Sequence, residues 1–332
     1  MDRITIEDVA ARAGVSPTTV SHVFSGHRPV RGETKLLVEQ VAIELGYRPN
    51  AVARSLRVQR TSTAMIILPD ITNPFYPEFA RGVQDVLRGG NYHTLLCNTD
   101  SREEEERAFL DEAISRRLDG IVFVGYWVAP AELIEVAAAG VAVVNVGEGV
   151  SGATIDSVRS TDEIGSREAT AFLLDRYGPS VALIDGTEAA LVAKARRSGF
   201  HSALRTAGVE LRAAFEVSED FTREGGRRGM AALLDLASPP RAVFCANDQI
   251  AIGALDEARS RGLSVPGDVA IVGFDDIDAA SMVQPQLTTV HNSPDVLGAR
   301  SGELLLSRMT GDYSGPGRDV VVPANLIIRE SA

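Results

Sequence analysis

The sequence predicts an α/β protein with two parts: a small all-α helix-turn-helix head and a larger two-lobed α/β body with parallel sheets. Two observations predict this class. From about residue 61 onward, apolar strand-like runs alternate with amphipathic helical segments, a pattern typical of βαβ units. Before about residue 48, the chain instead contains short helical patterns separated by turn residues. A chain of 332 residues, 45% of them hydrophobic, is long enough for such separate domains.

The first two helices of the head are separated by a very short turn. Thr5 can cap the first helix, and Asp8 would complete a weak capping box. Gly14 suits the position just after that helix, and Ser16 and Pro17 suit the start of the next one. This spacing is typical of a helix-turn-helix, although three short amphipathic helices could also form a plain bundle.

The second head helix is expected to run from Pro17 to about Phe24, with a polar, exposed start. In a helix-turn-helix this start enters the major groove of DNA, where hydroxyls and imidazoles can bond base edges or phosphates. A third helix is expected over about residues 32–45, with its inner face formed by Leu37, Val41 and Leu45.

The charge of the chain is unevenly distributed. The whole chain carries a net charge of −12, which taken alone argues against nucleic acid. Residues 1–60, however, contain nine Lys and Arg against six acidic residues, so the remaining chain carries −15. A basic head on an acidic body is expected when one small part contacts phosphate and the rest must stay away from it.

A basic segment, residues 47–57, follows the head. It has a short helical pattern in which Asn50 is a good N-cap. A helix of about two turns is marginal alone, so we expect it to order only against a partner. Leu56 lies between Arg54 and Arg57. It could be a linker leucine docked on the body, or an apolar wedge in the minor groove with the arginines on phosphate.

The body contains more strands than one sheet is expected to hold, so we expect two α/β lobes. Strands are expected at 64–68, 93–97, 120–124, 141–146, 181–185, 242–246 and 269–274. Helices are expected at 76–89, 103–117, 161–176, 190–207, 224–236 and 249–261. Open α/β sheets bind ligands near the carboxyl ends of their strands, and a cleft between lobes is a common ligand site.

Several side chains at these strand ends suit a polyhydroxylated or ring-shaped ligand. Aromatic rings can flank it, a guanidinium offers a rigid fork of donors, and an amide and a carboxylate can bond hydroxyls. The candidates are Phe75, Tyr76, Arg196, Phe221, Asn247 and Asp275. Most have an alternative interpretation: Asp275, with Asp276, could cap a following helix, Asn247 could also be a helix cap, and the aromatic residues could belong to the core. The acidic run 103–106 is interpreted as a solvated helix start.

Other features argue against several classes of protein. Cys97 and Cys245 lie in apolar runs, which predicts two buried free thiols in a reducing compartment. No signal sequence or membrane-spanning run is visible, so we expect a soluble, cytoplasmic protein. The five histidines are scattered, and no zinc, nucleotide-binding or hydrolase motif is present. We therefore expect no metal, no cofactor and no enzyme activity.

Residues 4–57, ITIEDVAARAGVSPTTVSHVFSG…YRPNAVARSLR, closely resemble the head and hinge of the lactose/galactose-repressor family. Through TTVSHV and AVARSL the head is most similar to that of the purine repressor. The resemblance continues through ITNPFY, ARRSGF, AVFCANDQIAIGAL, VPGDVAIVGFDD and LTTVHNSP. It implies three parts: a head over 1–48, a hinge helix and linker over 49–60, and a periplasmic-binding-protein-like sensor and dimerisation domain over 61–332.

The resemblance also implies a function. A homodimer would read a palindromic double-stranded operator, with both copies of Leu56 inserted at its central step. Thr18 and His22 would approach bases, Pro17 would contribute apolar contact or shape, and Arg28 would contact DNA from the following loop. Arg31 departs from the Ser or Thr cap of many relatives. The residues expected to contact DNA are Pro17, Thr18, Thr19, Ser21, His22, Arg28, Arg54, Leu56 and Arg57.

In the body, Arg196, Asn247 and Asp275 match the family's effector contacts, and Phe75, Tyr76 and Phe221 match its aromatic pocket positions. The resemblance implies a chain that crosses between the lobes three times around an effector, most often a sugar or sugar derivative. Asn145 stands where many sugar-responsive relatives carry Asp, which weakens the case for any one sugar. The expectation is an effector-controlled transcription regulator, a repressor; the alternative is a plain sugar-binding protein of the periplasmic type.

Overall fold

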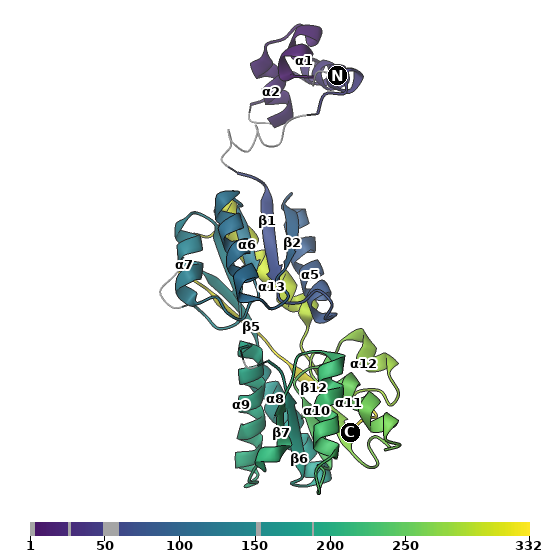
Figure 1. Cartoon of the computed structure of the whole chain (residues 1–332). Helices are drawn as coiled ribbons and strands as arrows, with labels where there is room; N and C mark the ends of the chain where they lie inside the picture. The colour runs from purple at the N-terminus through teal and green to yellow at the C-terminus, as the bar shows by residue number, and fades with distance from the viewer. Residues whose placement is uncertain (1–3, 26–27, 49–59, 151–153, 188) are drawn as a thin grey trace. The chain divides into compact units, whose positions relative to one another are not determined.

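The computed structural model describes residues 4–25, 28–48, 60–150, 154–187 and 189–332. The chain divides into two compact units, Met1–Ser62 and Thr63–Ala332 (Figure 1). The hinge residues Arg54, Leu56 and Arg57 lie outside the described residues. Among the helices that the structure describes, none combines the length and the apolar character that a membrane span requires.

The first unit contains the three helices of the head, α1 (Ile6–Ala13), α2 (Pro17–Ser25) and α3 (Gly32–Leu45). The capping box of α1 is present: the backbone N–H of Thr5 donates to Asp8 Oδ2 at 2.8 Å, and Asp8 N–H donates to Thr5 Oγ1 at 3.4 Å. Gly14 ends α1 in the left-handed conformation at φ 66°. Ser16 Oγ accepts from Thr19 N–H at 3.1 Å at the start of α2. These predicted turn features are confirmed.

The core of the head includes the buried residues Val9, Ala10, Val20, Val38 and Val41. The predicted inner face of α3 is wrong at one position, because Leu37 is 46% exposed. Val38, Val41 and Ala42 follow the i, i+3, i+4 spacing of one helical face, and Leu37 is rotated about 100° from Val38. As the departure at Arg31 indicated, α3 begins without a side-chain cap.

The second unit is the body, which has two α/β lobes, as predicted. Lobe 1 is built on a six-stranded parallel sheet with the order β11-β5-β4-β3-β1-β2. Its strands are β1 (Thr63–Leu68), β2 (His93–Asn98), β3 (Gly120–Phe123), β4 (Ala142–Val146), β5 (Asp156–Ser160) and β11 (Asp319–Val322). Its helices are α5 (Phe75–Gly89), α6 (Glu103–Ser115), α7 (Pro130–Ala138) and α13 (Pro294–Thr310).

Lobe 2 is built on a four-stranded parallel sheet with the order β7-β6-β8-β9. Its strands are β6 (Val181–Asp185), β7 (Glu216–Ser218), β8 (Ala242–Cys245) and β9 (Ala270–Val272), and the antiparallel pair β10 (Thr289–His291) and β12 (Asn325–Ile327) stands beside them. Its helices are α8 (Asp162–Tyr177), α9 (Leu191–Thr206), η1 (Ala213–Phe215), α10 (Arg223–Leu234), α11 (Asp248–Ser260) and α12 (Asp278–Met282).

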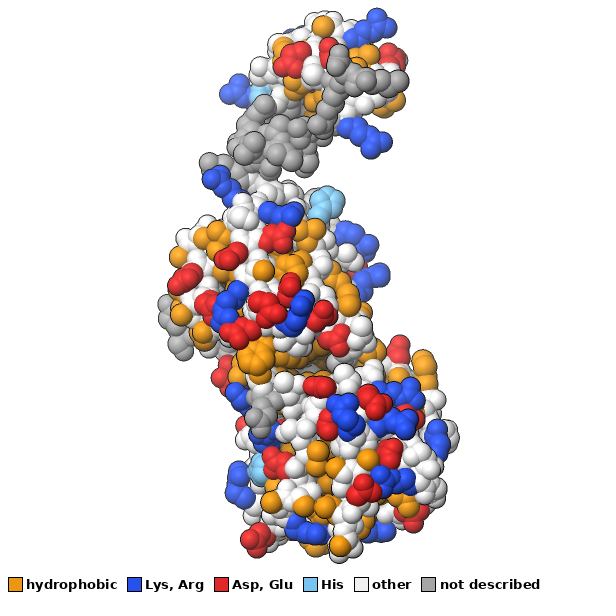
Figure 2. Space-filling model, in the orientation of Figure 1, with side chains coloured by type: hydrophobic (Ala, Val, Ile, Leu, Met, Phe, Trp, Pro, Cys, Tyr) orange, Lys and Arg blue, Asp and Glu red, His pale blue; other side chains and the backbone are white. Residues whose placement is uncertain are grey.

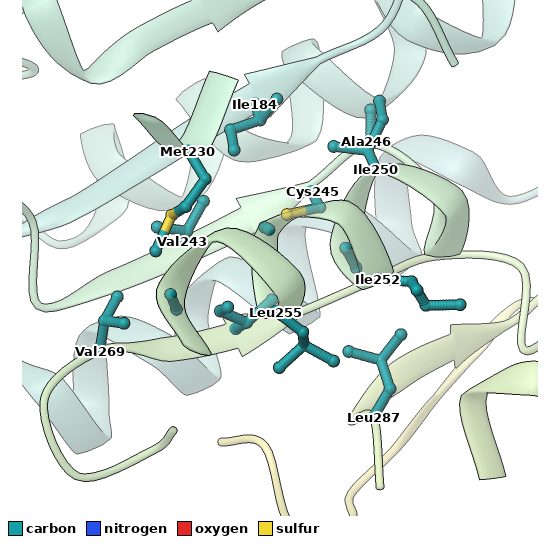
Figure 3. Packing of buried hydrophobic residues seen from close by; sticks show 14 of the residues in the cluster. Ile184, Met230, Val243, Cys245, Ala246, Ile250, Ile252, Leu255, Val269 and Leu287 are labelled. Atoms are coloured by element: carbon teal, nitrogen blue, oxygen red, sulfur yellow. The ribbon is translucent and has the colours of Figure 1, made fainter. Parts of the chain in front are cut away.

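An apolar core fills lobe 2 on the α10 and α11 side of its sheet (Figure 3). Val243 and Cys245 point from β8 toward Ile250 and Leu255 of α11, and all four are buried. Burial raises the pKa of the Cys245 thiol, which keeps it protonated. Cys97 is free but only half-buried, so the prediction of two buried thiols is correct for Cys245 alone.

The chain crosses between the lobes three times, after β5, after β10 and after β11. Two of these crossings are bonded to each other: Thr161 N–H donates to the carbonyl of Val322 at 3.1 Å, and Ala324 N–H donates to Thr161 Oγ1 at 2.8 Å. The ligand cleft predicted from the strand ends would therefore be bounded by the three crossing segments that connect one lobe to the other.

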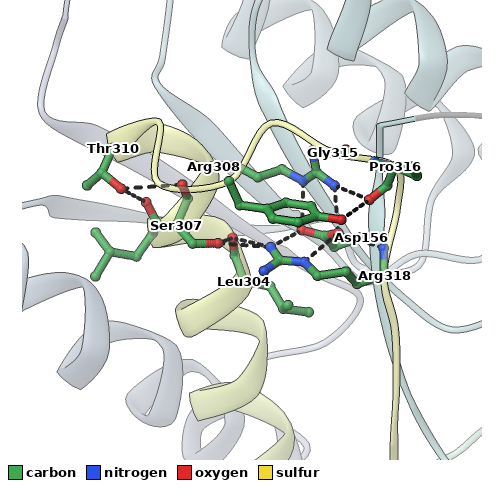
Figure 4. A network of polar contacts seen from close by, with 10 residues as sticks. Asp156, Leu304, Ser307, Arg308, Thr310, Gly315, Pro316 and Arg318 are labelled. Atoms are coloured by element: carbon green, nitrogen blue, oxygen red, sulfur yellow. Dashed lines mark hydrogen bonds and ion pairs between the residues drawn. The ribbon is translucent and has the colours of Figure 1, made fainter.

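A buried ion network links distant parts of lobe 1 (Figure 4). Asp156, at the start of β5, accepts from Arg308 Nε of α13 at 2.7 Å and from Arg318 Nη2 at 2.6 Å. The ring of Tyr313 lies against both guanidinium groups, at 5.0 and 4.0 Å. Burial opposes the charge of Asp156, but the two arginines outweigh it and lower its pKa. The network holds β5, α13 and the segment before β11 together.

Helices α5 and α13 of lobe 1 pack with their backbones in close approach. A Cβ atom at Gly82 of α5 would lie 2.5 Å from the carbonyl oxygen of Asp295 in α13. A Cβ at Gly298 of α13 would be closer still to the carbonyl of Phe79. Glycine at these positions therefore permits the helix that follows the second crossing to lie directly on the helix that begins with Phe75.

Candidate ligand cavity and nucleic-acid interface

A cavity of about 90 Å³ lies between the lobes of the body. All six residues predicted to contact a ligand line it: Phe75, Tyr76, Arg196, Phe221, Asn247 and Asp275. Lobe 1 contributes the start of α5 and the loop after β3, and lobe 2 contributes α9 and the ends of β8 and β9. The structure therefore brings together residues from 75 to 275 of the sequence at one lobe junction.

Arg196 is the centre of the charged part of the cavity. It is 4% exposed, and all three guanidinium nitrogens donate hydrogen bonds. Nε donates to Asp162 Oδ1 at 2.8 Å, Nη1 to the carbonyl of Ala246 at 2.6 Å, and Nη2 to Asp275 Oδ1 at 3.0 Å. Burial opposes the charge, but Asp275 and Asp162 outweigh it and raise the pKa of Arg196. Two carboxylates thus share one fixed guanidinium, whose fork is held in place before any ligand binds.

Asp275 lies just after β9 with φ at 110°, a conformation that side chains rarely adopt. Burial raises its pKa to about 6, although Arg196 and a hydrogen bond from Asn292 lower it. The alternative interpretation of Asp275 and Asp276 as helix caps is wrong, since the following helix α12 begins at Asp278 and its N-cap residue is Ile277, with no side-chain cap. Asp276 instead binds Arg329 at 2.6 Å and His291 at 3.0 Å.

Asn247 combines the two roles that were considered for it. Its Oδ1 accepts from Ile250 N–H at 2.8 Å and caps α11. Its Nδ2 lies 3.4 Å from the carbonyl of Phe221, and both residues line the cavity. The cap therefore fixes the amide, which in turn holds the loop that carries the Phe221 ring.

The aromatic residues form both cavity wall and core. Phe75 packs against the apolar clusters of both lobes and meets Tyr76 edge-on, with ring centroids 5.3 Å apart. The hydroxyls of Tyr76 and Tyr126 lie 3.1 Å apart and can share a hydrogen bond. Apolar walls with a few fixed polar groups are typical of small-molecule sites.

Some cavity residues were not predicted from the sequence. They are Asn73, Tyr126, Arg159, Ser160, Asp162 and Asn292. The side-chain oxygens Ser160 Oγ and Asn292 Oδ1 are buried without a hydrogen-bond partner among the described residues. Ser160 and Asp162 were missed because strand β5, DSVRS, has no apolar run to mark it. Asn145, in contrast, does not line the cavity, and its Nδ2 donates to the carbonyl of Glu148 at 2.9 Å.

The acidic run at the start of α6 was interpreted as fully solvated, and this is wrong for one residue. Glu103 pairs with Arg107 and Glu105 with Arg102 at the surface. Glu106, however, is completely buried, and its carboxylate accepts hydrogen bonds from the loop after β3. It faces inward because it lies one turn into the helix, on the side of the buried Leu110 and Ala113.

The candidate DNA-reading surface is the start of α2. Pro17 and Thr18 are exposed, whereas Thr19 is half-buried and its hydroxyl lies 2.9 Å from that of Ser16. Ser21 and His22 are half-buried on the same helix. Arg28, in the segment between α2 and α3, is exposed. Over the visible face of the chain, Lys and Arg are interspersed with Asp and Glu (Figure 2).

A helix-turn-helix head followed by a two-lobed body with a cavity between its lobes defines a ligand-responsive DNA-binding regulator. The family model for bacterial regulatory proteins of the LacI family matches residues 5–50. The model for a periplasmic binding protein-like domain matches residues 171–332. Catabolite control protein A of Priestia megaterium is 35% identical over 92% of this chain and 92% of that protein. The chain belongs to the LacI family.

Other relatives and solved structures cover nearly the same extent. The HTH-type transcriptional repressor CytR of Escherichia coli (strain K12) is 32% identical over 98% of this chain and 96% of its own. The lac repressor dimer bound to operator and the anti-inducer ONPF has a TM-score of 0.87 at 25% identity, over 99% of both chains. The CelR–cellobiose complex has a TM-score of 0.75 at 30% identity, over 99% of this chain and 100% of that one.

Proposed function

We propose that this protein is a transcriptional repressor that binds a palindromic operator as a homodimer, and that a small molecule in the lobe cavity controls its operator affinity. The observation that carries the proposal is the position of the cavity beside crossings of the chain, with Ser160 and Asn292 among its lining residues. A ligand that binds both lobes favours one angle between them, and its differential affinity for the two angles is coupled to the affinity for DNA.

The effector that fits this cavity best is a neutral compound with several hydroxyls, such as a sugar or sugar derivative. Arg196 is already neutralised by Asp162 and Asp275, so an anionic ligand would find no unpaired charge there. Carboxylate, amide and hydroxyl groups of Asp275, Asn247, Asn292 and Ser160 can bond hydroxyls between aromatic walls. In support, solved structures of relatives include a cellobiose complex and one with bound ribose. The protein would bind this ligand without transforming it.

The head would read the operator through the exposed start of α2, in the major groove. Pro17, Thr18, Thr19, Ser21, His22 and Arg28 are the proposed contacts from the head, and Arg54, Leu56 and Arg57 those from the hinge segment. We also propose that the head reads DNA in the manner of the purine repressor, whose head it resembles through TTVSHV and AVARSL. A repressor acts where the chromosome is, so the cytoplasm is its proposed location.

The dimer surface would include the edge strand β2 of lobe 1. β2 pairs only with β1 in its sheet, and Leu95 and Leu96 on it are 38% and 45% exposed. In lobe 2, Met282 of α12 is 76% exposed. An unpaired sheet edge with exposed leucines tends to aggregate unless another chain packs against it. A second copy of the same chain is the simplest partner for it.

The proposal is tested by fluorescence-polarisation binding to palindromic DNA from the promoter of the protein's own gene. D-Ribose, cellobiose, nucleosides and nucleobases are added in turn. We expect tight, salt-sensitive binding that prefers the palindrome to scrambled DNA, and release or strengthening by one class of ligand. Binding that does not distinguish the palindrome from scrambled DNA at any salt concentration would overturn the repressor function.

The hinge contact is tested by Leu56→Ala. The substitution should weaken palindrome binding by roughly ten- to a hundred-fold, because the wedge acts on the kinkable central step. Binding to scrambled DNA should change little. Leu36→Ala, which truncates a leucine of α3 that is 69% exposed, is the matched control. Equal losses on both DNAs would remove the wedge from the proposal.

A further inference from the structure

The loop between β3 and α7 carries Tyr126 into the wall of the cavity, and a single carboxylate holds that loop. Glu106 Oε1 accepts from Tyr126 N–H at 2.7 Å. Glu106 Oε2 accepts from Trp127 N–H at 3.0 Å and from Val128 N–H at 3.2 Å. Three consecutive backbone donors therefore converge on one buried side chain from α6.

This arrangement depends on the charge of the carboxylate. Charge-assisted hydrogen bonds are shorter and stronger than neutral ones, and buried backbone N–H groups are costly when they lose their partner. Gly125 lets the loop close on Glu106, since a Cβ atom there would lie 2.8 Å from the carboxyl group. A glutamine at position 106 would keep the volume but replace one acceptor oxygen with a donor group that opposes the N–H groups.

The loop determines where the Tyr126 hydroxyl lies. That hydroxyl is 3.1 Å from the Tyr76 hydroxyl of α5, and both residues line the cavity. Burial raises the pKa of Tyr126 to about 12, and the charges of Arg196 and Asp275 also act on it. The tyrosine pair of lobe 1 thus faces the charged group of lobe 2, and a ligand that fills the cavity would contact both.

We propose that Glu106 is a positioning residue for the cavity: it holds residues 126–128 so that Tyr126 completes the ligand-binding wall of lobe 1. Glu106 does not itself line the cavity, and acts through the loop. Its effect on ligand binding rests on the proposed function, whereas its hold on the loop can be measured without any ligand.

The test compares the full-length protein with Glu106→Gln and with Glu104→Gln. Glu104 lies in the same first turns of α6 but is exposed, so its substitution removes an equal charge from the same helix start. Hydrogen exchange of the Tyr126, Trp127 and Val128 amides reports the loop directly. The fluorescence of Trp127, the one tryptophan of the chain, reports the same loop during titration with D-ribose and cellobiose.

In Glu106→Gln we expect the three amides to exchange at least about tenfold faster, while Glu104→Gln exchanges like the wild type. The sugar that the wild type binds should bind roughly tenfold or more weakly to Glu106→Gln, with operator binding of the ligand-free protein retained. Glu106→Asp keeps the charge on a shorter side chain, so its amide exchange and its sugar affinity should lie between those of the wild type and Glu106→Gln. It replaces Glu106→Gln in the test if that variant does not fold.

Unchanged amide exchange in Glu106→Gln would overturn the proposal. So would faster exchange with unchanged affinity for a sugar that the wild type binds, since the loop would then not serve the cavity. A wild type that binds neither sugar, together with faster exchange in Glu106→Gln and partly restored protection in Glu106→Asp, would support the hold on the loop and count against a simple sugar as effector. The test therefore distinguishes a failure of the positioning role of Glu106 from a failure of the proposed sugar effector.

Discussion

At the scale of single residues, the cavity is organised by charge compensation. Arg196 is held by Asp162 from the first crossing and by Asp275 from the end of β9. Removing Arg196 would leave two buried carboxylates uncompensated, so Arg196→Ala would lower stability as well as ligand binding. Substitutions at Asp275 are the more informative ones, because they leave one carboxylate on the guanidinium.

Asp275 should make stability depend on pH. Its pKa is raised to about 6 in the folded protein, above the ordinary value of 3.8, so the folded state binds more protons between these pH values. Stability from this group is present below pH 4 and is lost as the pH rises through 6. The unfolding free energy of the wild type, relative to the non-titrating Asp275→Asn, should fall by about 2 kcal/mol between pH 4 and 7.

Chemical denaturation at several pH values measures this difference. Asp278→Asn, which removes an exposed carboxylate nearby, serves as the control and should show no such trend relative to the wild type. A stability difference between wild type and Asp275→Asn that stays constant or rises with pH would contradict a raised pKa at Asp275.

The six residues predicted for the cavity could be recognised in the sequence for two reasons. Each has a side chain suited to binding a ligand, and each lies near a strand end or a helix start that the sequence pattern or the family resemblance identifies. Glu106 has no such signal, because its neighbours Glu103 and Glu105 are surface acids of the same type. Only its phase on α6 separates it, because Glu106 lies four and seven residues before the buried Leu110 and Ala113. Leu37 was misplaced because it lies four residues before the buried Val41, although Val38, three residues before Val41, is the one that faces the core.

At the scale of elements, close helix packing explains why one long helix of lobe 1 was not predicted. Seven strands and six helices of the body are found close to their predicted limits. Helix α13 was not predicted, although it covers the lobe 1 sheet. Its pattern is interrupted by Gly298 and Gly302, residues that weaken helices. In the folded protein these same glycines permit the contact with α5.

The close approach of α5 and α13 can be tested within one helix. Gly82→Ala should destabilise the protein by about 1–3 kcal/mol, because the new methyl group meets backbone atoms of α13. Gly89→Ala on the same helix has nothing within 4 Å and should be neutral or stabilising by up to about 1 kcal/mol. Thermal unfolding of both variants measures the contrast. Equal effects at the two positions would mean that α5 is not held at this distance.

At the scale of the whole molecule, the basic and the acidic excess of charge are separated. The head carries the basic excess and the body the acidic one, which limits non-specific attraction of the body to DNA. The exposed leucines of β2, in contrast, lie on a sheet edge that can pair or pack. A dimeric operator-binding protein requires one surface that contacts DNA and a different surface that contacts the second subunit.

The proposed dimer surface gives a direct prediction. Leu96→Asp should convert the protein from dimer to monomer at micromolar concentration, because burying an unpaired carboxylate costs several kcal/mol. Light scattering after size-exclusion chromatography measures the mass. Ile134→Asp on α7, a residue that is 41% exposed, is the control for adding one charge at an apolar surface site. A Leu96→Asp protein that remains dimeric would place the interface elsewhere.

The network around Asp156 has a consequence for how the protein is made. Lobe 1 begins with β1 but is completed by α13 and β11, which end at Val322. Until those residues are synthesised, Asp156 lacks Arg308 and Arg318, and the apolar face that Leu305 and Met309 cover stays open. Lobe 2 also needs late residues: Ala324 and Ala332 belong to its core, and Ile271 N–H donates to the carbonyl of Ser331 at 2.9 Å. Neither lobe can therefore be completed before these late segments are synthesised, and a growing chain exposes the unfinished sheet of lobe 1 on the ribosome until then.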